Sequence, residues 1–225
     1  MTRGLFVAGT DTGVGKTRVA TAVLRGAAAG GLRAIGMKPV AAGIEPGAAA
    51  NADVVSLMQA GNVAALPKDV NPYVFEPPIA PHLAAAAAGT SIDLDAIASA
   101  YGRLAACADV VVVEGAGGVL VPISARYDML DIAAHLGLPV LLVVGMRLGC
   151  LNHALLSALA IDSRALRLAG WVANRIDPGM LEVKANVQAL AERLPAPLVA
   201  DLGWGAASAP LERVSLRMLG LVVGD

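Results

Sequence analysis

Short apolar runs alternate with longer helix-like stretches along almost the whole chain. The apolar runs carry few polar positions on either face and end near Gly or Pro, which is typical of parallel strands covered by helices. The predicted strands are residues 5–8, 33–37, 109–113, 139–144, 168–173 and 198–202. The predicted helices are residues 16–29, 52–60, 93–106, 128–136, 151–162 and 178–194. This alternation predicts an α/β fold with a doubly wound, mostly parallel β-sheet flanked by helices in a three-layer sandwich.

Glycines and charged residues follow every one of these predicted strands. Ligands of open parallel sheets bind beyond the carboxyl ends of the strands, so the segments that follow them are candidate binding segments. These segments are residues 9–17, 38–43, 114–118, 145–150, 174–175 and 203–205. Their shared character predicts a ligand site at one edge of the sheet.

The first of these segments, Gly-Thr-Asp-Thr-Gly-Val-Gly-Lys-Thr at residues 9–17, is typical of a phosphate-binding loop (P-loop). Its glycines let backbone N–H groups curl around an anion, and the following helix N-terminus adds positive potential. Lys16 then reaches the outer phosphates, and the Thr17 hydroxyl can bind Mg²⁺. The segment between Gly9 and Gly15 is one residue longer than in the commonest form. The alternative is a glycine-rich turn with a surface lysine, which the strand–turn–helix context disfavours.

Phosphate chemistry also needs a metal ion, and Mg²⁺ prefers hard oxygen ligands. Glu114 ends a strand of four valines, and Asp53 lies at the start of the second helix. With Thr17, these residues form a candidate metal site of one hydroxyl and two carboxylates. The alternatives are a strand-end charge exposed to water for Glu114 and a helix first-turn acid for Asp53.

Composition narrows the function classes. The chain of 225 residues is 56% hydrophobic, which excludes a disordered protein and predicts one domain over residues 1–225. Its 17 basic and 18 acidic residues argue against a general nucleic-acid or membrane-surface binder. The two cysteines, Cys107 and Cys150, are too few for a disulfide scaffold and suit reduced thiols in the cytoplasm. The strongly apolar stretch at 136–146 is too short to span a bilayer, and no targeting segment is evident.

Several blocks together resemble the dethiobiotin synthetase family, a biotin-pathway branch of the P-loop NTPases. The most specific are Gly-Cys-Leu-Asn-His at 149–153 and Gly-Trp-Val-Ala-Asn at 170–174. The matching blocks are residues 9–17, 38–43, 71–73, 81–82, 113–118, 144–153, 170–174 and 195–198. The resemblance spans about residues 4–205, nearly the whole chain.

This resemblance implies an ATP- and Mg²⁺-dependent carbon–nitrogen ligase acting in the penultimate step of biotin biosynthesis. The diamine 7,8-diaminononanoate reacts with CO₂ to form a carbamate, and ATP phosphorylates the carbamate to a carbamic-phosphoric anhydride. The second amine then closes the five-membered urea of dethiobiotin, releasing phosphate. The resemblance also implies a homodimer with the substrate near the subunit interface, and neither a nucleic-acid nor a membrane partner.

The resemblance assigns roles to individual residues. Lys16 holds the β- and γ-phosphates, and Lys38 holds the carbamate and the γ-phosphate together. The implied metal ligands are Thr17, Asp53 and Glu114. The implied ATP-binding residues are Gly13, Val14, Gly15, Lys16, Thr17, Arg18, Asp53, Glu114, Gly115, Ala116, Gly117, Asn174, Arg175, Gly203, Trp204 and Gly205. The implied substrate-binding residues are Thr12, Lys38, Ala42, Arg147, Cys150, Leu151 and Asn152.

Four positions depart from the family pattern. Ala42 stands where the family has a Ser or Thr that binds substrate, so that contact must come from backbone or water. Arg147 replaces the more usual Lys, which keeps the charge but changes the geometry. Arg175 replaces an acidic neighbour of the adenine-contacting Asn174, and Asn186 occupies a place where some members carry Tyr.

Three other functions of P-loop proteins fit this sequence less well. A nucleotide-switch ATPase of the partitioning or division-site class carries an additional lysine where this chain has Asp11. An amidoligase of cobalamin synthesis needs a glutaminase domain for which the chain has no room. A small-metabolite kinase needs its own acceptor site, which the 144–153 block does not suggest.

Overall fold

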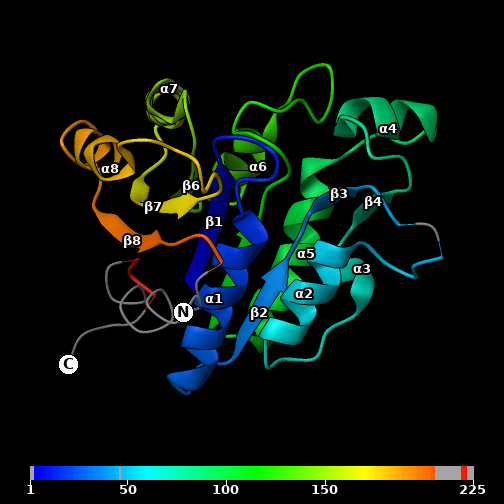
Figure 1. Ribbon diagram of the computed structural model, residues 1–225. Coiled ribbons are helices and arrows are strands. Elements are labelled where there is room, and N and C mark those ends of the chain that lie inside the picture. The colour runs from blue at the N-terminus through cyan, green and yellow to red at the C-terminus, as the bar shows by residue number, and fades with distance from the viewer. Residues whose placement is uncertain (1–2, 46, 206–218, 222–225) are drawn as a thin grey trace.

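The main sheet is parallel throughout and lies at the centre of the molecule (Figure 1). The computed structural model describes residues 3–45, 47–205 and 219–221. Within these ranges the sheet has six strands in the order β2-β5-β1-β6-β7-β8. They are β1 (Arg3–Gly9), β2 (Ala34–Met37), β5 (Val110–Glu114), β6 (Val140–Met146), β7 (Leu168–Arg175) and β8 (Leu198–Leu202). The predicted α/β fold with a parallel sheet is therefore confirmed.

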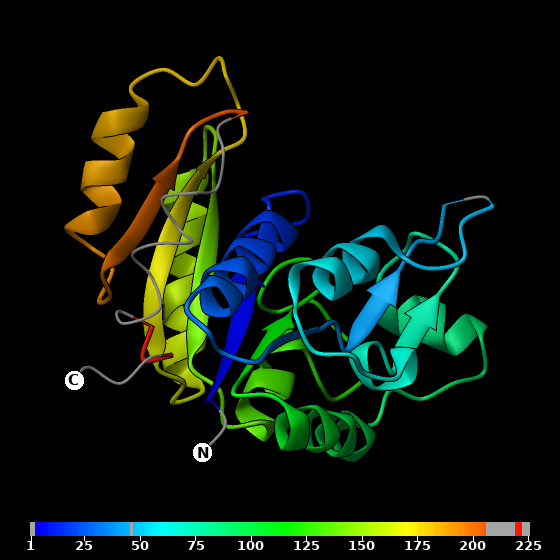
Figure 2. The ribbon, with the colours of Figure 1, turned by 90° about the horizontal axis from the view of Figure 1, so that it is seen from below.

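Helices cover both faces of this sheet, as the apolar strands require. The larger helices are α1 (Lys16–Ala29), α2 (Ala52–Ala60), α5 (Leu94–Cys107), α6 (Met129–His135), α7 (Cys150–Ser163) and α8 (Val183–Ala191). Along β1, Leu5 and Val7 are buried in a core that includes α1 and α2, whereas Phe6 and Ala8 are buried in a core that includes α5 to α8. Figure 2 shows α1 and α5 on opposite sides of the strands. The two cores explain why these strands are apolar at every position.

A small second sheet stands beside the main one. It pairs β3 (Val40–Ala42) with β4 (Tyr73–Phe75) in parallel, and the short helices α3 (Pro67–Val70) and α4 (Pro81–Ala87) flank it (Figure 1). The hydrophobic pattern predicts neither strand, because three residues are too few to show an alternation. This unit supplies one wall of the pocket described below.

Most predicted boundaries agree with the structure, and two differ in an informative way. Helix α8 begins at Val183, not at 178, because Glu182 has a left-handed backbone with φ 51° that ends the preceding turn. Strand β7 extends through Arg175, since Asn174 and Arg175 continue the ladder with Gly145 and Met146 of β6. The predicted binding segment at 174–175 is thus the end of a strand.

The parallel direction of the strands brings the segments that follow them to one edge of the sheet. Gly9, Met37, Glu114 and Met146 end four strands that lie side by side in the sheet.

Among the described residues, no helix has the length and apolar character needed to cross a membrane.

Candidate active site

The P-loop joins β1 to α1 and has the backbone geometry of an anion cradle. Gly13 and Gly15 have left-handed conformations with φ 74° and φ 91°, which favour glycine. A Cβ atom on Gly15 would also lie 2.2 Å from Nδ2 of Asn174. Helix α1 begins directly after Gly15, and no side chain caps its N-terminus. Its free N–H groups and the loop N–H groups can therefore bind phosphate.

Lys16 is buried against this loop. Its Nζ donates a hydrogen bond to the carbonyl oxygen of Asp11 at 2.8 Å, and the side chain lines the pocket. Burial, and after it repulsion from the Lys38 ammonium, lowers the pKa of Lys16 to about 8. A phosphate placed at Nζ would favour the charged form, so nucleotide binding and protonation of Lys16 are linked.

This linkage predicts how ATP affinity depends on pH. As pH rises through about 8, Lys16 of the free protein loses its proton, and its attraction for the triphosphate is lost with it. We expect the dissociation constant of ATP to rise by up to about tenfold per pH unit above that value, as expected for one linked proton. Calorimetric titrations between about pH 7.5 and 9.5, in the range where Lys16 titrates, measure this dependence. Lys16→Ala should remove it, and an unchanged affinity of the wild-type chain across the range would contradict it.

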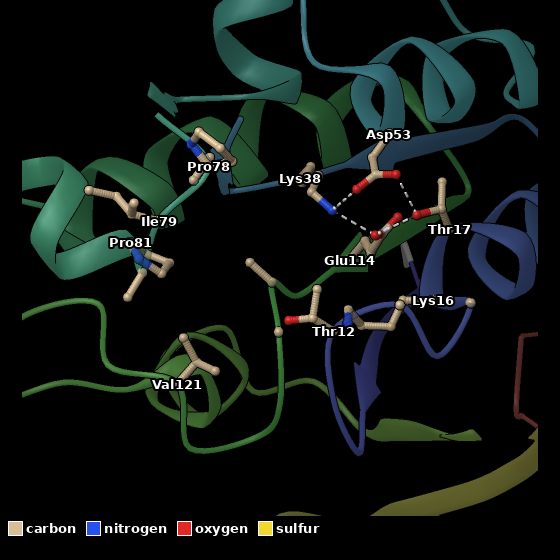
Figure 3. Close-up of a pocket in the computed structure, with 16 residues that line it drawn as sticks. Thr12, Lys16, Thr17, Lys38, Asp53, Pro78, Ile79, Pro81, Glu114 and Val121 are labelled. Carbon is tan, nitrogen blue, oxygen red and sulfur yellow. Dashed lines mark hydrogen bonds and ion pairs between the residues drawn. The ribbon is translucent and has the colours of Figure 1, made fainter. Parts of the chain in front are cut away.

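Four side chains, from α1, α2, β5 and the residue that follows β2, meet beside the loop (Figure 3). The Thr17 hydroxyl lies 2.8 Å from Oδ1 of Asp53 and 2.9 Å from Oε1 of Glu114. The Nζ atom of Lys38 lies 2.7 Å from both Oδ2 of Asp53 and Oε1 of Glu114. Lys38 and Glu114 are only 4% and 1% exposed. One cation and two carboxylates thus form a compact network with the hydroxyl, buried at Lys38 and Glu114 and partly open to solvent at Asp53, whose side chain is 42% exposed.

The charges in this network are mutually dependent. Burial disfavours the ammonium form of Lys38, but attraction from Glu114 and then Asp53 outweighs it and raises the Lys38 pKa. Burial likewise opposes ionisation of Asp53, but the Lys38 ammonium lowers the pKa of that carboxyl. Lys38 is therefore a fixed positive charge and cannot act as a base near neutral pH.

The same network is suited to a divalent cation. Oε2 of Glu114 is buried and has no hydrogen-bond partner among the described residues, which is costly unless a cation or water contacts it. Thr17, Asp53 and Glu114 present hard oxygen atoms, the ligand type that Mg²⁺ prefers. The described residues include no cluster of three or more His, Cys, Asp or Glu side chains suited to a metal, so phosphates and water would complete the coordination.

A pocket of about 610 Å³ opens onto this network. One wall comes from the P-loop and from Ala116 and Gly117 after β5, and the floor includes Lys38 and Glu114. The opposite wall is mostly apolar, and Figure 3 shows its side chains across the pocket from Lys16 and Lys38. This wall consists of Pro78, Ile79, Ala80 and Pro81, while Val121 lines the pocket next to Gly117, and Ala42 also lines it. The pocket therefore joins a strongly charged end to an apolar end.

A second network lies on the other side of the loop. Asn174 is buried; its Nδ2 donates to the Val14 carbonyl at 2.7 Å, and its Oδ1 accepts from Arg18 at 2.6 Å. Arg18 also donates to the Gly203 carbonyl at 3.3 Å. The three segments 14–18, 174 and 203 are thus held together, and Trp204 lies exposed next to them. Arg175 pairs with Asp201 at 2.6 Å.

The segment after β6 lies outside the pocket of its own chain. Arg147 pairs with Asp11 of the P-loop at 2.5 Å, and Cys150 is buried at the start of α7. None of Arg147, Cys150, Leu151 and Asn152 is among the residues that line the pocket.

Comparisons with known proteins identify the family of this chain. The chain matches the protein family described as "AAA domain" over residues 3–210. A protein of Nitrosospira multiformis named ATP-dependent dethiobiotin synthetase is 54% identical over 204 residues, covering 91% of this chain and 89% of the relative. One of the same name from Aromatoleum aromaticum is 50% identical over 221 residues, covering 97% and 98%. The chain belongs to the dethiobiotin synthetase family. The predicted membership and the prediction of an ATP-dependent carbon–nitrogen ligase are confirmed at this level.

Solved structures agree with the fold of this synthetase-family chain. The septum site-determining protein MinD of Pyrococcus horikoshii, complexed with Mg-ADP, is 14% identical with a TM-score of 0.56, covering 97% of this chain and 89% of its own. A chain of the MinC:MinD cell division protein complex of Aquifex aeolicus is also 14% identical, with a TM-score of 0.60 and coverage of 99% and 98%. At this identity the likeness concerns the fold alone.

The structure brings together most residues that the family resemblance implies for the charged end. Those lining the pocket are Thr12, Gly13, Gly15, Lys16, Thr17, Lys38, Ala42, Asp53, Glu114, Ala116 and Gly117. Val14 and Gly115 instead pack inward, since a Cβ on Gly115 would lie 3.0 Å from the ring of Phe6. Neither the apolar wall at 78–81 nor Val121 was predicted as part of the site. The matching block Pro81-His82 is a sequence signal for this wall, but only the fold shows that the wall faces the lysines.

Proposed function

We propose that this chain converts 7,8-diaminononanoate and CO₂ to dethiobiotin in a ring closure driven by ATP. Membership of the dethiobiotin synthetase family supports the reaction class. The observation that carries the proposal is the convergence of Lys16, Lys38 and Glu114 from three distant segments on one pocket with an apolar opposite wall. A diamine with a long apolar chain suits a pocket that is charged at one end and apolar at the other.

The reaction proceeds in three steps, each balanced. One amine of the substrate attacks CO₂, which forms a carbon–nitrogen bond and gives a carbamate and a proton. A carbamate oxygen attacks the γ-phosphorus of ATP, and the bond to the ADP oxygen breaks. The second amine then attacks the carbonyl carbon, phosphate leaves, and the amine releases its proton. The middle step brings two anions together and therefore depends on positive charge.

Lys16 and Lys38 supply that charge from two sides. Lys16 lies against the P-loop, where it holds the β- and γ-phosphates. Lys38 lies at the pocket floor, where it holds the carbamate against the γ-phosphate. Both side chains are buried, so their charges act in a medium that screens them weakly. Their contribution is orientation and charge stabilisation, not proton transfer.

Mg²⁺ is the metal that this donor set fits, and Thr17, Asp53 and Glu114 are the residues we propose to hold it. When bound, it neutralises charge on the β- and γ-phosphates. Thr17 orients the two carboxylates through its hydroxyl. Thr12 and the backbone around Ala42 contact the diamine, since Ala42 offers no side-chain hydrogen bond.

Removing the Glu114 charge should weaken the response to Mg²⁺. Glu114→Gln keeps the shape and can still accept from Thr17, but it loses the negative charge that a cation needs. We expect the half-saturating Mg²⁺ concentration for ATP turnover to rise by roughly tenfold or more, since loss of a group that only supports a metal ligand already costs about that much. Asp109→Asn, at the other end of β5, is the matched control. Equal Mg²⁺ dependence in the two variants would argue against the assignment.

On the other side of the P-loop, we propose that Asn174, Arg175 and the 203–205 segment border the nucleotide base. The Asn174 amide already bonds Val14 and Arg18, so it fixes the shape of this border as well as contacting the base. With the base on that side of the P-loop, the apolar wall on the opposite side of the pocket would remain free for the diamine.

We propose a homodimer, which would account for the position of residues 147–152. They lie outside the pocket of their own chain, and leucines near them are exposed: Leu148 is 96% and Leu181 85% exposed, and Leu156 and Leu159 are exposed on α7. Pairing two chains over this surface would cover the leucines and could present the N-terminus of α7 to the substrate carboxylate in the other pocket. The cytoplasmic location and the single domain stay predictions.

Turnover of ATP with each component omitted in turn tests the proposed reaction. We expect phosphate release to require Mg²⁺, bicarbonate and the diamine together, with dethiobiotin formed in equal amount. Turnover that is indifferent to the diamine would contradict the proposal and favour a nucleotide switch.

A further inference from the structure

Asp11 is an acidic residue in the middle of an anion-binding loop, and its charge is compensated by one specific partner. Nη2 of Arg147 lies 2.5 Å from Oδ2 of Asp11, while the Thr12 N–H donates to Oδ1 at 2.7 Å. The Asp11 carbonyl accepts the 2.8 Å bond from Lys16. The same residue therefore contacts the lysine that we assign to the phosphates and carries a negative charge beside it.

Arg147 comes from a different loop, 136 residues away in the sequence. It follows β6, the strand that pairs with β1, so the two loops emerge side by side from the sheet. The Gly145 N–H near the end of β6 donates a 3.4 Å hydrogen bond to the hydroxyl of Thr10, which is a second link between β6 and the loop after β1. The Arg147 guanidinium is thus held beside the P-loop, although it does not line the pocket.

We propose that Arg147 is a positioning residue for the nucleotide, acting by neutralising Asp11 and so removing a negative charge from the surroundings of the bound polyphosphate. Without the guanidinium, the Asp11 carboxylate repels the phosphates and competes with them for Lys16. With it, Asp11 keeps its role in shaping the loop, because it still caps the Thr12 N–H. This inference deepens the proposed function but rests only on the part of it that places ATP at the P-loop.

The signature of this role is an asymmetric double-mutant cycle measured on nucleotide affinity. Arg147→Gln leaves Asp11 charged and unpaired, and we expect it to weaken Mg-ATP binding roughly tenfold at low salt. Asp11→Asn keeps an oxygen for the Thr12 N–H and leaves Arg147 as an added cation, so we expect binding somewhat tighter than wild type. The double variant should recover to within about threefold of wild type, because its lost charges cancel.

Calorimetry with Mg-ATP in the absence of the diamine provides the measurement, and the defect of Arg147→Gln should shrink as salt is raised. Arg33→Gln is the matched control. It also removes an arginine from an ion pair with an aspartate, Asp109, but this pair lies at the opposite ends of the strands from the P-loop. We expect it to bind as wild type does.

Three outcomes would overturn the inference. Wild-type affinity in Arg147→Gln would show that Asp11 needs no neutralising, and a double variant as weak as Arg147→Gln would show that Arg147 acts by direct contact or by holding the loop fold. An equal loss in Arg33→Gln would also overturn it, by assigning the effect to net charge. Because the readout is ATP affinity, absence of diamine-dependent turnover would contradict the proposed reaction and leave this inference standing.

Discussion

Replacing Lys38 with alanine should abolish phosphate release driven by the diamine while leaving a protein that still binds ATP. We expect kcat to fall by on the order of 10³ or more, because the group is assigned to hold two anions at the moment they react. The P-loop and Lys16 remain in Lys38→Ala, so we expect ATP affinity to change by less than about tenfold. Steady-state phosphate release and equilibrium ATP binding measure the two quantities separately.

This variant also strips the cation from two carboxylates, so its fold must be checked. Lys38 is the ion-pair partner of both Asp53 and Glu114, and its loss leaves them facing each other. Thermal unfolding with and without Mg-ATP shows whether the variant is folded and binds its ligand. Lys68→Ala, which removes an exposed lysine on α3, is the control that should keep wild-type turnover. Near-normal turnover in folded Lys38→Ala would refute the assigned role.

Replacing Lys16 with alanine should damage both binding and chemistry. Lys16 is buried at the phosphate loop and has a charge that acts on the β- and γ-phosphates. We expect kcat to fall by on the order of 10²–10³, the cost of losing one preorganised charge-stabilising donor. ATP affinity should fall as well, unlike in Lys38→Ala. Single-turnover rates at saturating ATP isolate the chemical step.

The matched control for Lys16 lies on the same helix. Arg25 is exposed on α1, so Arg25→Ala removes a positive charge without touching the loop. A loss of less than about tenfold in kcat for Lys16→Ala would argue against its place at the transferred phosphate. A similar loss in both variants would point to disruption of α1 instead.

The parts of this site that the sequence predicts are those that follow long, apolar strands. Glu114 could be predicted because four buried valines precede it, and Lys16 because glycines in a strand-to-helix turn have few other uses. Parallel strands end at a common edge of the sheet, so the convergence of Glu114 and Lys16 at that edge also follows from the pattern. The contact between Lys38 and Glu114 requires in addition that β2 and β5 be neighbours, which the structure shows.

The parts that the sequence does not predict depend on tertiary placement. The apolar wall at 78–81 lies in an irregular segment, and β3 and β4 beside it are too short to show a period. The early start predicted for α8 fails because a single left-handed residue, Glu182, cannot be read from helix propensity. The pairing of Arg147 with Asp11 joins two loops, and no local signal encodes such a pairing.

The central claim is that two lysines at neighbouring sheet edges bring the carbamate and the γ-phosphate together. A crystal structure with Mg²⁺, the diamine and a non-hydrolysable ATP analogue tests it most directly. We expect the terminal phosphate within hydrogen-bond distance of Nζ of Lys16, and Nζ of Lys38 between that phosphate and the nearer amine. A triphosphate bound away from the carboxyl end of β1, or a diamine outside the pocket that holds Lys38, would contradict the account.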